Sequence, residues 1–114
     1  MSGKAPSVNH ITIAGNLVKE PELINVGERK IPKISITLAH NRSYKDKEGN
    51  WKEDTSYIDV EAWSKLAERV NKSASKGNPV LVEGTLKQDR WKGKDDKTKS
   101  RMFIRAEKIH ILDI

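Results

Sequence analysis

The chain has 114 residues, no cysteine and a formal net charge of +6, with a pI of about 9.6. This length is enough for one domain with its own core, and the absence of cysteine excludes disulfides, thiolate metal sites and cysteine nucleophiles. We find no secretory h-region and no apolar run of the roughly 20 residues that a membrane helix needs. The excess positive charge favours a polyanionic partner.

The N-terminal part of the chain predicts a leader followed by a strand. Residues 1–7 are small and polar, which is typical of a flexible leader before a single domain over residues 8–114. The domain opens with alternating aliphatic and small or polar residues, a strand pattern in which Gly15 indicates a bulge or bend. Pro21 ends this strand because proline removes a ladder donor, and residues 23–30 show no clear pattern.

Alternating aliphatic and polar residues predict two further strands, over residues 33–43 and 54–63. The charged residues 44–53 between them predict a long loop with a Gly-Asn turn. Two bulky rings, Tyr57 and Trp63, lie on the polar face of the third strand, which is unusual for a solvated face. They either cover a loop or an oligomer interface, or form a stacking platform.

One helix follows the third strand. Ser64 is a candidate N-cap, Leu66 and Val70 lie at helical spacing, and Lys76 followed by Gly77 is a typical helix end.

Two last strands are predicted over residues 80–92 and 100–112, and a lysine-rich tip joins them into a long hairpin. Gly84 indicates a bulge, and a change of alternation near residues 107–108 indicates a bulge or bend. Five strands with one helix between the third and fourth is the element order of the OB-fold, a five-stranded, partly open Greek-key barrel. The predicted fold class is therefore all-β, an OB-fold barrel with one helix.

Signs of an enzyme are weak. The three histidines are scattered without ligand spacing, and the chain has no nucleophile motif and no phosphate-binding glycine loop. Asp59 and Glu61 share a strand face, but on a basic protein such carboxylates more often pair with lysine or arginine across strands than act as acid and base. We therefore predict no catalytic residue, no metal site and no cofactor.

Signs of binding are stronger. Only Phe103 among the six aromatic residues is a core candidate, and the other five lie among polar or charged residues: Tyr44, Trp51, Tyr57, Trp63 and Trp91. Residues 86–105 hold eight basic and three acidic side chains, a net charge of +5 around Trp91. Rings among cations suit single-stranded nucleic acid, because stacking contributes about 1–3 kcal/mol per base and tolerates any sequence. The one helix has a mixed charged face and does not resemble a duplex-reading helix.

Several short motifs in the chain resemble those of the bacterial single-stranded DNA-binding protein family over residues 8–112. The motifs are Gly15-Asn-Leu17, Glu20-Pro-Glu22, Trp63-Ser-Lys-Leu-Ala-Glu68, Val82-Glu-Gly-Thr-Leu86 and Arg90-Trp91. The resemblance implies an OB-fold that assembles as a homotetramer and binds single-stranded DNA during replication, recombination and repair. It also implies a cytoplasmic, nucleoid-associated protein with no membrane partner.

The resemblance also implies site residues. The stacking rings would be Tyr44, Tyr57, Trp63 and Trp91, and the phosphate contacts would be Lys45, Lys47, Lys65, Lys76, Lys87 and Arg90. The charge around Trp91 adds Lys92 and Lys94 to the DNA-binding candidates.

The sequence departs from the family at three places. Asp59 and His10 stand where the family often has a basic residue. The family typically continues into an acidic tail that recruits replication proteins, whereas this sequence stops at Asp113-Ile114, so we expect no tail-mediated contacts from these residues.

Two other functions fit the same pattern. One is a primosome-type or RNA-type OB module that contacts a protein partner as well as nucleic acid. The other is a nuclease-like OB-fold enzyme. Quenching of tryptophan by oligo-dT, reversed by salt, would separate them from sequence-independent DNA binding.

Overall fold

The computed structural model describes residues 5–112. The first four residues of the predicted leader and the terminal Asp113-Ile114 therefore lie outside the described part of the chain. The elements are β1 (Ile11–Leu17), β2 (Glu22–Val26), β3 (Ile31–Lys45), β4 (Trp51–Trp63), α1 (Ser64–Ser73), β5 (Pro79–Lys92) and β6 (Thr98–Ile111).

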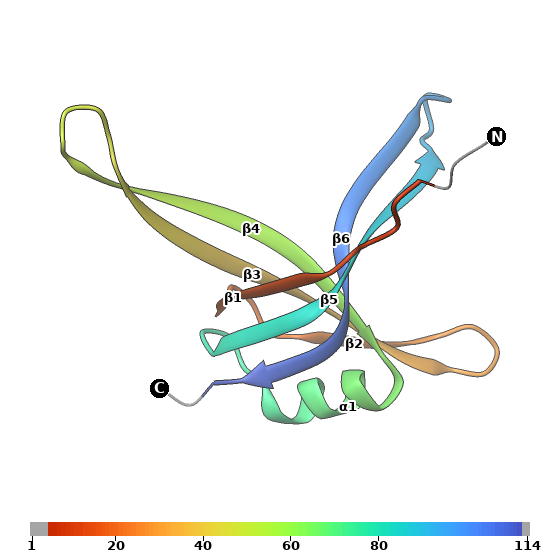
Figure 1. The fold of residues 1–114 in the computed structure, drawn as a ribbon. Coiled ribbons are helices and arrows are strands. Elements are labelled where there is room, and N and C mark those ends of the chain that lie inside the picture. Colours follow the sequence, from red (N-terminus) through yellow and green to blue (C-terminus); the bar gives the residue numbers. More distant parts are fainter. Residues whose placement is uncertain (1–4, 113–114) are drawn as a thin grey trace.

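The strands form one sheet that closes on itself (Figure 1). Their order is β1-β5-β6-β4-β3-β2, and a further pairing of β1 with β3 completes a five-stranded barrel of β1, β3, β4, β5 and β6. All neighbours are antiparallel except β4 and β6, which are parallel. This arrangement confirms the predicted OB-fold, with the helix between what were predicted as the third and fourth strands. The unassigned residues near 23 form an additional strand, β2, in a hairpin with β3.

Aliphatic side chains on alternate strand positions build the core. They come from every barrel strand, from one stripe of α1 and from its C-cap residue: Leu17, Ile34, Ile36, Leu38, Val60, Ala62, Ala67, Val70, Ala74, Val80, Val82, Ile104 and Ile109. No aromatic side chain belongs to this cluster. Phe103, predicted as a core residue, is buried but packs outside it. The core cluster is thus aliphatic, and every ring except that of Phe103 is at least partly exposed.

The barrel closes where β1 approaches β3 at Gly15. β1 pairs with β5 from Ile11 to Asn16 and with β3 at Asn16 and Leu17. A Cβ added at Gly15 would lie 2.5 Å from the carbonyl oxygen of Ala39 on β3. Only glycine therefore allows the two backbones to lie this close. The register of β1 with β5 runs through Gly15 without a shift, so glycine serves this close approach and not the predicted bulge.

The predicted irregularities at Gly84 and at residues 107–108 are one β-bulge. Glu83 pairs with Lys108, whereas Gly84 pairs with Ala106, so Glu107 is the extra residue on β6. The bulge confirms both predictions and bends the β5–β6 pair away from the barrel.

The predicted loop over residues 44–53 is wrong in its extent. β3 continues to Lys45, β4 begins at Trp51, and the turn is only residues 46–50, closed by two backbone N–H groups that donate to the carboxylate of Asp46. Charged residues form a strand here because two-stranded pairing satisfies the backbone while polar side chains pair across it. Arg42, for example, lies 4.0 Å from Asp54.

The predicted N-cap at Ser64 is also wrong. The cap residue is Trp63, with extended backbone and no side-chain cap hydrogen bond, and Ser64 is the first helical residue with a φ of 58°. The chain turns sharply from β4 into α1 at this point, which requires the left-handed conformation. The helix ends at Ser73, three residues before the predicted Lys76.

Two long ribbons extend from the barrel (Figure 1). The outer halves of β3 and β4 form one arm, and the outer halves of β5 and β6 form the other; the arms diverge, with α1 at the opposite end of the barrel. The radius of gyration is 17.2 Å, against about 13 Å for a compact domain of this length. Most of the polar surface of these arms is therefore available to a ligand.

We expect the substitution Gly15→Ala to lower the free energy of unfolding by about 1–3 kcal/mol, because the new Cβ would press against the backbone of Ala39. Chemical or thermal denaturation followed by circular dichroism measures this loss. The control is Gly93→Ala, whose Cβ would meet the movable end of the Lys99 side chain, so its effect should stay within about 0.5 kcal/mol. Equal stability of the two variants would contradict the proposed role of Gly15 in closure.

Candidate nucleic-acid interface

The side of β4 that faces away from the core carries Tyr57, Asp59, Glu61 and Trp63. We call this side, with its continuation onto the neighbouring strands, the outer face. Tyr57 is 70% exposed, whereas the side chain of Trp63 is partly buried. Val60 and Ala62 belong to the core and Ile58 packs against it, which confirms the predicted alternation within β4.

Trp63 lies between cations from two neighbouring strands. Lys33 on β3 is its register partner, with Nζ 5.6 Å from the ring centroid. The guanidinium of Arg105 on β6 lies 5.4 Å from the same centroid. The indole Nε1–H donates a hydrogen bond of 3.1 Å to Glu61. The ring is therefore held in place by three side chains while it remains at the surface.

Glu61 is the buried acid of the outer face, with a relative exposure of 6%. Its carboxylate lies 3.3 Å from Nζ of Lys33 and 3.7 Å from the guanidinium of Arg101. This confirms for Glu61, but not for Asp59, the prediction that these carboxylates pair with basic residues across strands. Asp59 instead accepts a hydrogen bond of 3.1 Å from the hydroxyl of Thr37.

The outer face continues onto β6 and β5. Arg105 is the register partner of Glu61, and alternation places Phe103 and Arg101 on the same side. The guanidinium of Arg101 lies 4.6 Å from the ring centroid of Phe103. On β5, Lys87 pairs with Phe103. A row of alternating rings and cations thus crosses three strands.

The β5–β6 arm extends this face and holds most of the predicted basic cluster. Trp91 is 47% exposed and is the register partner of Lys99. Its position on β5 is four residues beyond Lys87, so alternation puts both side chains on one side of the ribbon. Near the tip, Lys92 pairs with Asp96 at 3.8 Å.

The β3–β4 arm carries its rings in a different way. Tyr44 is 40% exposed under the guanidinium of Arg42, 5.2 Å from the ring centroid. Trp51 is 68% exposed, with Nζ of Lys45 at 5.2 Å. Tyr44 pairs with Lys52, and the register puts it on the opposite side of the ribbon from Tyr57. Tyr44 therefore does not join the outer face.

The predicted cations fall into three groups. Lys45 and Lys47 lie at the tip of the β3–β4 arm, whereas Lys87, Arg90, Lys92 and Lys94 follow the β5–β6 arm and its turn. Lys65 is in the first turn of α1, two residues after Trp63. Lys76 follows α1, where its backbone N–H donates to Glu20 at 3.0 Å, and it lies away from both arms. The structure does not bring Lys76 near the tryptophans.

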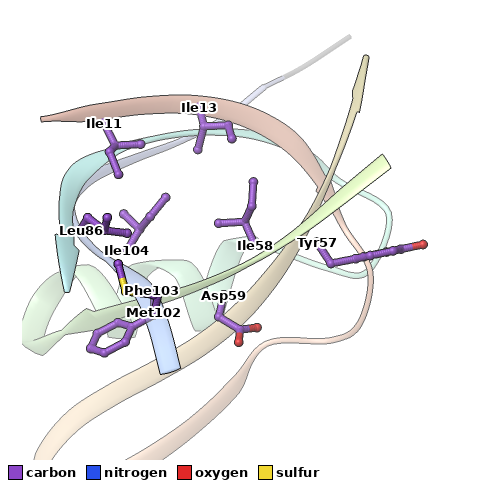
Figure 2. A pocket seen from close by; sticks show the side chains of 9 residues that line it. All are labelled: Ile11, Ile13, Tyr57, Ile58, Asp59, Leu86, Met102, Phe103 and Ile104. Atoms are coloured by element: carbon purple, nitrogen blue, oxygen red, sulfur yellow. The ribbon is translucent and has the colours of Figure 1, made fainter. Parts of the chain in front are cut away.

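An apolar cavity of about 350 Å³ opens between β1, β4, β5 and β6 (Figure 2). Ile11, Ile13 and Ile58 point into it, while the ring of Tyr57 points away. Within residues 5–112, no group of three His, Asp or Glu side chains could hold a metal ion. Over the same range, no helix is long and apolar enough to cross a membrane.

Sequence reasoning missed four residues of the outer face: Lys33, Arg101, Phe103 and Arg105. Alternation alone puts the last three on one side of β6, but which side faces the aromatic residues of β4 depends on the parallel β4–β6 pairing. That pairing joins residues about 44 positions apart and leaves no local signal in the sequence.

The chain matches known proteins over nearly its whole length. It fits the model of the single-strand binding protein family over residues 8–112. It is 35% identical over 108 residues to single-stranded DNA-binding protein 2 of Chlorobaculum tepidum, covering 95% of this chain and 73% of that protein. It is 37% identical over 106 residues to the single-stranded DNA-binding protein of Aquifex aeolicus, covering 93% and 71%.

Solved structures have the same fold. A deletion mutant of the single-stranded DNA binding protein from Thermus aquaticus superposes with a TM-score of 0.83 at 26% identity, over 93% of this chain and 51% of that one. The Plasmodium falciparum SSB in complex with ssDNA superposes with a TM-score of 0.87 at 20% identity, over 97% and 100%. At that identity the second match supports the fold alone.

Proposed function

Because this chain belongs to the single-strand binding protein family, we propose that it binds and protects single-stranded DNA of any sequence during replication, recombination and repair. Membership makes it a nonenzymatic single-stranded DNA-binding protein. Bases stack on surface rings, and lysines and arginines neutralise phosphates.

The observation that carries the proposal is the mixture of rings and cations on the outer face. Trp63 lies within 6 Å of Lys33 and of Arg105, and Tyr57, on the same side of β4, is 70% exposed. A single strand presents flat bases and charged phosphates at a short repeat, so this mixture suits both of its parts. A duplex hides its bases in the stack and would leave these rings unused.

The proposed site combines rings that stack bases with cations that contact phosphates. Tyr57, Trp63 and Trp91 stack bases along the outer face, and Tyr44 stacks a base on the β3–β4 arm. The phosphate contacts come from the arms and from the helix region: Lys45, Lys47, Lys65, Lys76, Lys87, Arg90, Lys92 and Lys94. The domain over residues 8–114 works as a homotetramer, as the family resemblance implies. Lys76 has the weakest support, because it is remote from the rings.

We expect oligo-dT to quench the tryptophan fluorescence strongly at low salt, because bases stack on Trp63 and Trp91. Added salt should reverse the quench, since counterion release drives phosphate binding. A titration in the Trp51→Phe variant removes the contribution of the most exposed tryptophan. Duplex DNA of the same length is the control and should quench much less. An absence of quenching by oligo-dT at low salt would sink the proposal.

Trp63→Ala and Trp91→Ala should each weaken dT binding by about five- to 150-fold, which corresponds to the 1–3 kcal/mol of a lost stack. The salt dependence should change little, because no cation is removed. Trp→Phe at the same positions keeps a ring and serves as the matched control, with most of the affinity retained. Anisotropy of a fluorescein-labelled oligonucleotide measures these affinities. Wild-type affinity in both alanine variants would refute the stacking platform.

Lys87→Ala should reduce the slope of log K against log salt by about 0.7, the value for one phosphate of a single strand. Lys87 lies on the outer face as the register partner of Phe103. Lys108→Ala removes an equal charge from an exposed site on β6, beyond the bulge and away from the rings. The same change of slope in both variants would mean that net charge, and not the site, sets the salt dependence.

A further inference from the structure

Glu61 is a carboxylate at the centre of a face that otherwise suits an anion. It lies between Lys33 and Arg101 and forms ion pairs with both of these cations. A neutral residue at this position would leave the two cations free and would make the face more basic. The attraction of phosphates therefore does not explain why an acid stands here.

The contacts of Glu61 with Trp63 offer a different explanation. One strand residue, Ala62, separates Glu61 from Trp63, so both side chains lie on one side of β4, and Oε1 of Glu61 accepts the indole N–H at 3.1 Å. An indole N–H points outward in the plane of the ring. A hydrogen bond to it fixes the direction of the ring edge without itself occupying a π-face, over which Lys33 and Arg105 lie 5.6 Å and 5.4 Å from the ring centroid. Such a contact can orient a stacking ring without competing with the base.

The acid is itself held rigidly. It is 6% exposed, and its other oxygen, Oε2, lies within 4 Å of Lys33 and of Arg101, on the strands that flank β4. A carboxylate fixed by two cations is a firmer acceptor than a mobile surface acid. The chain of contacts from Lys33 and Arg101 through Glu61 ends at the Trp63 ring.

We propose that Glu61 is a positioning residue that locks the Trp63 ring in its stacking orientation before DNA arrives. This role rests on the proposed function, since it concerns the platform that holds a base. A ring ordered in advance loses less freedom when a base stacks on it, which is worth about two- to tenfold in affinity for a side chain of this size. The acid thus supports binding although its charge opposes the ligand.

Two substitutions separate the hydrogen bond from the charge. Glu61→Gln and Glu61→Val both remove the negative charge and release Lys33 and Arg101. Only glutamine keeps an oxygen that can accept the indole N–H. Valine suits a strand, and thermal melts followed by circular dichroism check that both variants fold.

The first measurement is made without DNA. In a protein carrying Trp51→Phe and Trp91→Phe, Trp63 is the one remaining tryptophan. Its time-resolved fluorescence anisotropy should show no fast local motion with Glu61 or Glu61→Gln. Glu61→Val should add a fast component, because the ring has lost its acceptor.

The second measurement is the affinity for fluorescein-labelled oligo-dT at one salt concentration, with the native tryptophans 51 and 91 retained. Glu61→Val should bind about two- to tenfold more weakly than Glu61→Gln. In a Trp63→Phe background, which has no indole N–H, the two variants should bind equally. This double-mutant cycle isolates the part of the affinity change that depends on the hydrogen bond between residue 61 and the Trp63 indole.

Three results would overturn the inference. They are an unchanged ring motion in Glu61→Val, equal affinities of the valine and glutamine variants, or a difference between them that persists with phenylalanine at position 63. The last result would show that Glu61 affects the DNA affinity through the structure of the sheet and not through the Trp63 ring. Failure of the wild-type protein to bind oligo-dT would instead overturn the proposed function and this role with it, so the two failures are distinguishable.

Discussion

The close approach of β1 to β3 at Gly15 is the constraint on which the other features depend. It lets β1 pair with β5 along most of its length and still reach β3 at Asn16 and Leu17, which closes the barrel. Closure removes two open sheet edges and fixes β4 and β6 side by side. The outer face exists only because that parallel contact brings Glu61 next to Arg105. The close approach that Gly15 allows between β1 and β3 is thus a condition for the outer face on β4 and β6.

The division of side chains between core and surface has a direct functional consequence. Thirteen aliphatic or alanine side chains make up the core cluster, so the fold does not need its tryptophans for stability. Rings are costly to expose without a purpose, yet Trp91 and Tyr57 stand largely open. The register partner of Trp91 is Lys99, a charged neighbour that keeps this exposed ring from joining a contiguous apolar patch. This separation lets stacking evolve without disturbing the core.

Much of the fold could be predicted from local patterns, and much of the site could not. Strand alternation, the helix and the bulge at Gly84 each have a short-range signal, and each was found. The arm at residues 44–53 was missed because side-chain polarity says little about a two-stranded ribbon, whose stability comes from backbone pairing and cross-strand contacts such as Arg42 with Asp54. The residue type of Ser64 predicts an N-cap, but the sharp turn from β4 into α1 puts this residue inside the helix with a φ of 58°. Phe103 and Arg101 join the site through long-range pairing, which no local pattern encodes.

The distribution of rigidity over the molecule matches the nature of a single strand. Trp63 and Glu61 belong to the barrel body, where neighbouring strands on both sides restrain them. Most of the lysines lie on two-stranded arms or turns, which lack a third strand and bend more easily. Bases need a flat surface at a defined angle, whereas phosphates need only nearby charge. Fixed rings with adaptable cations therefore let one surface hold a flexible polymer in many registers, which is what binding without sequence preference requires.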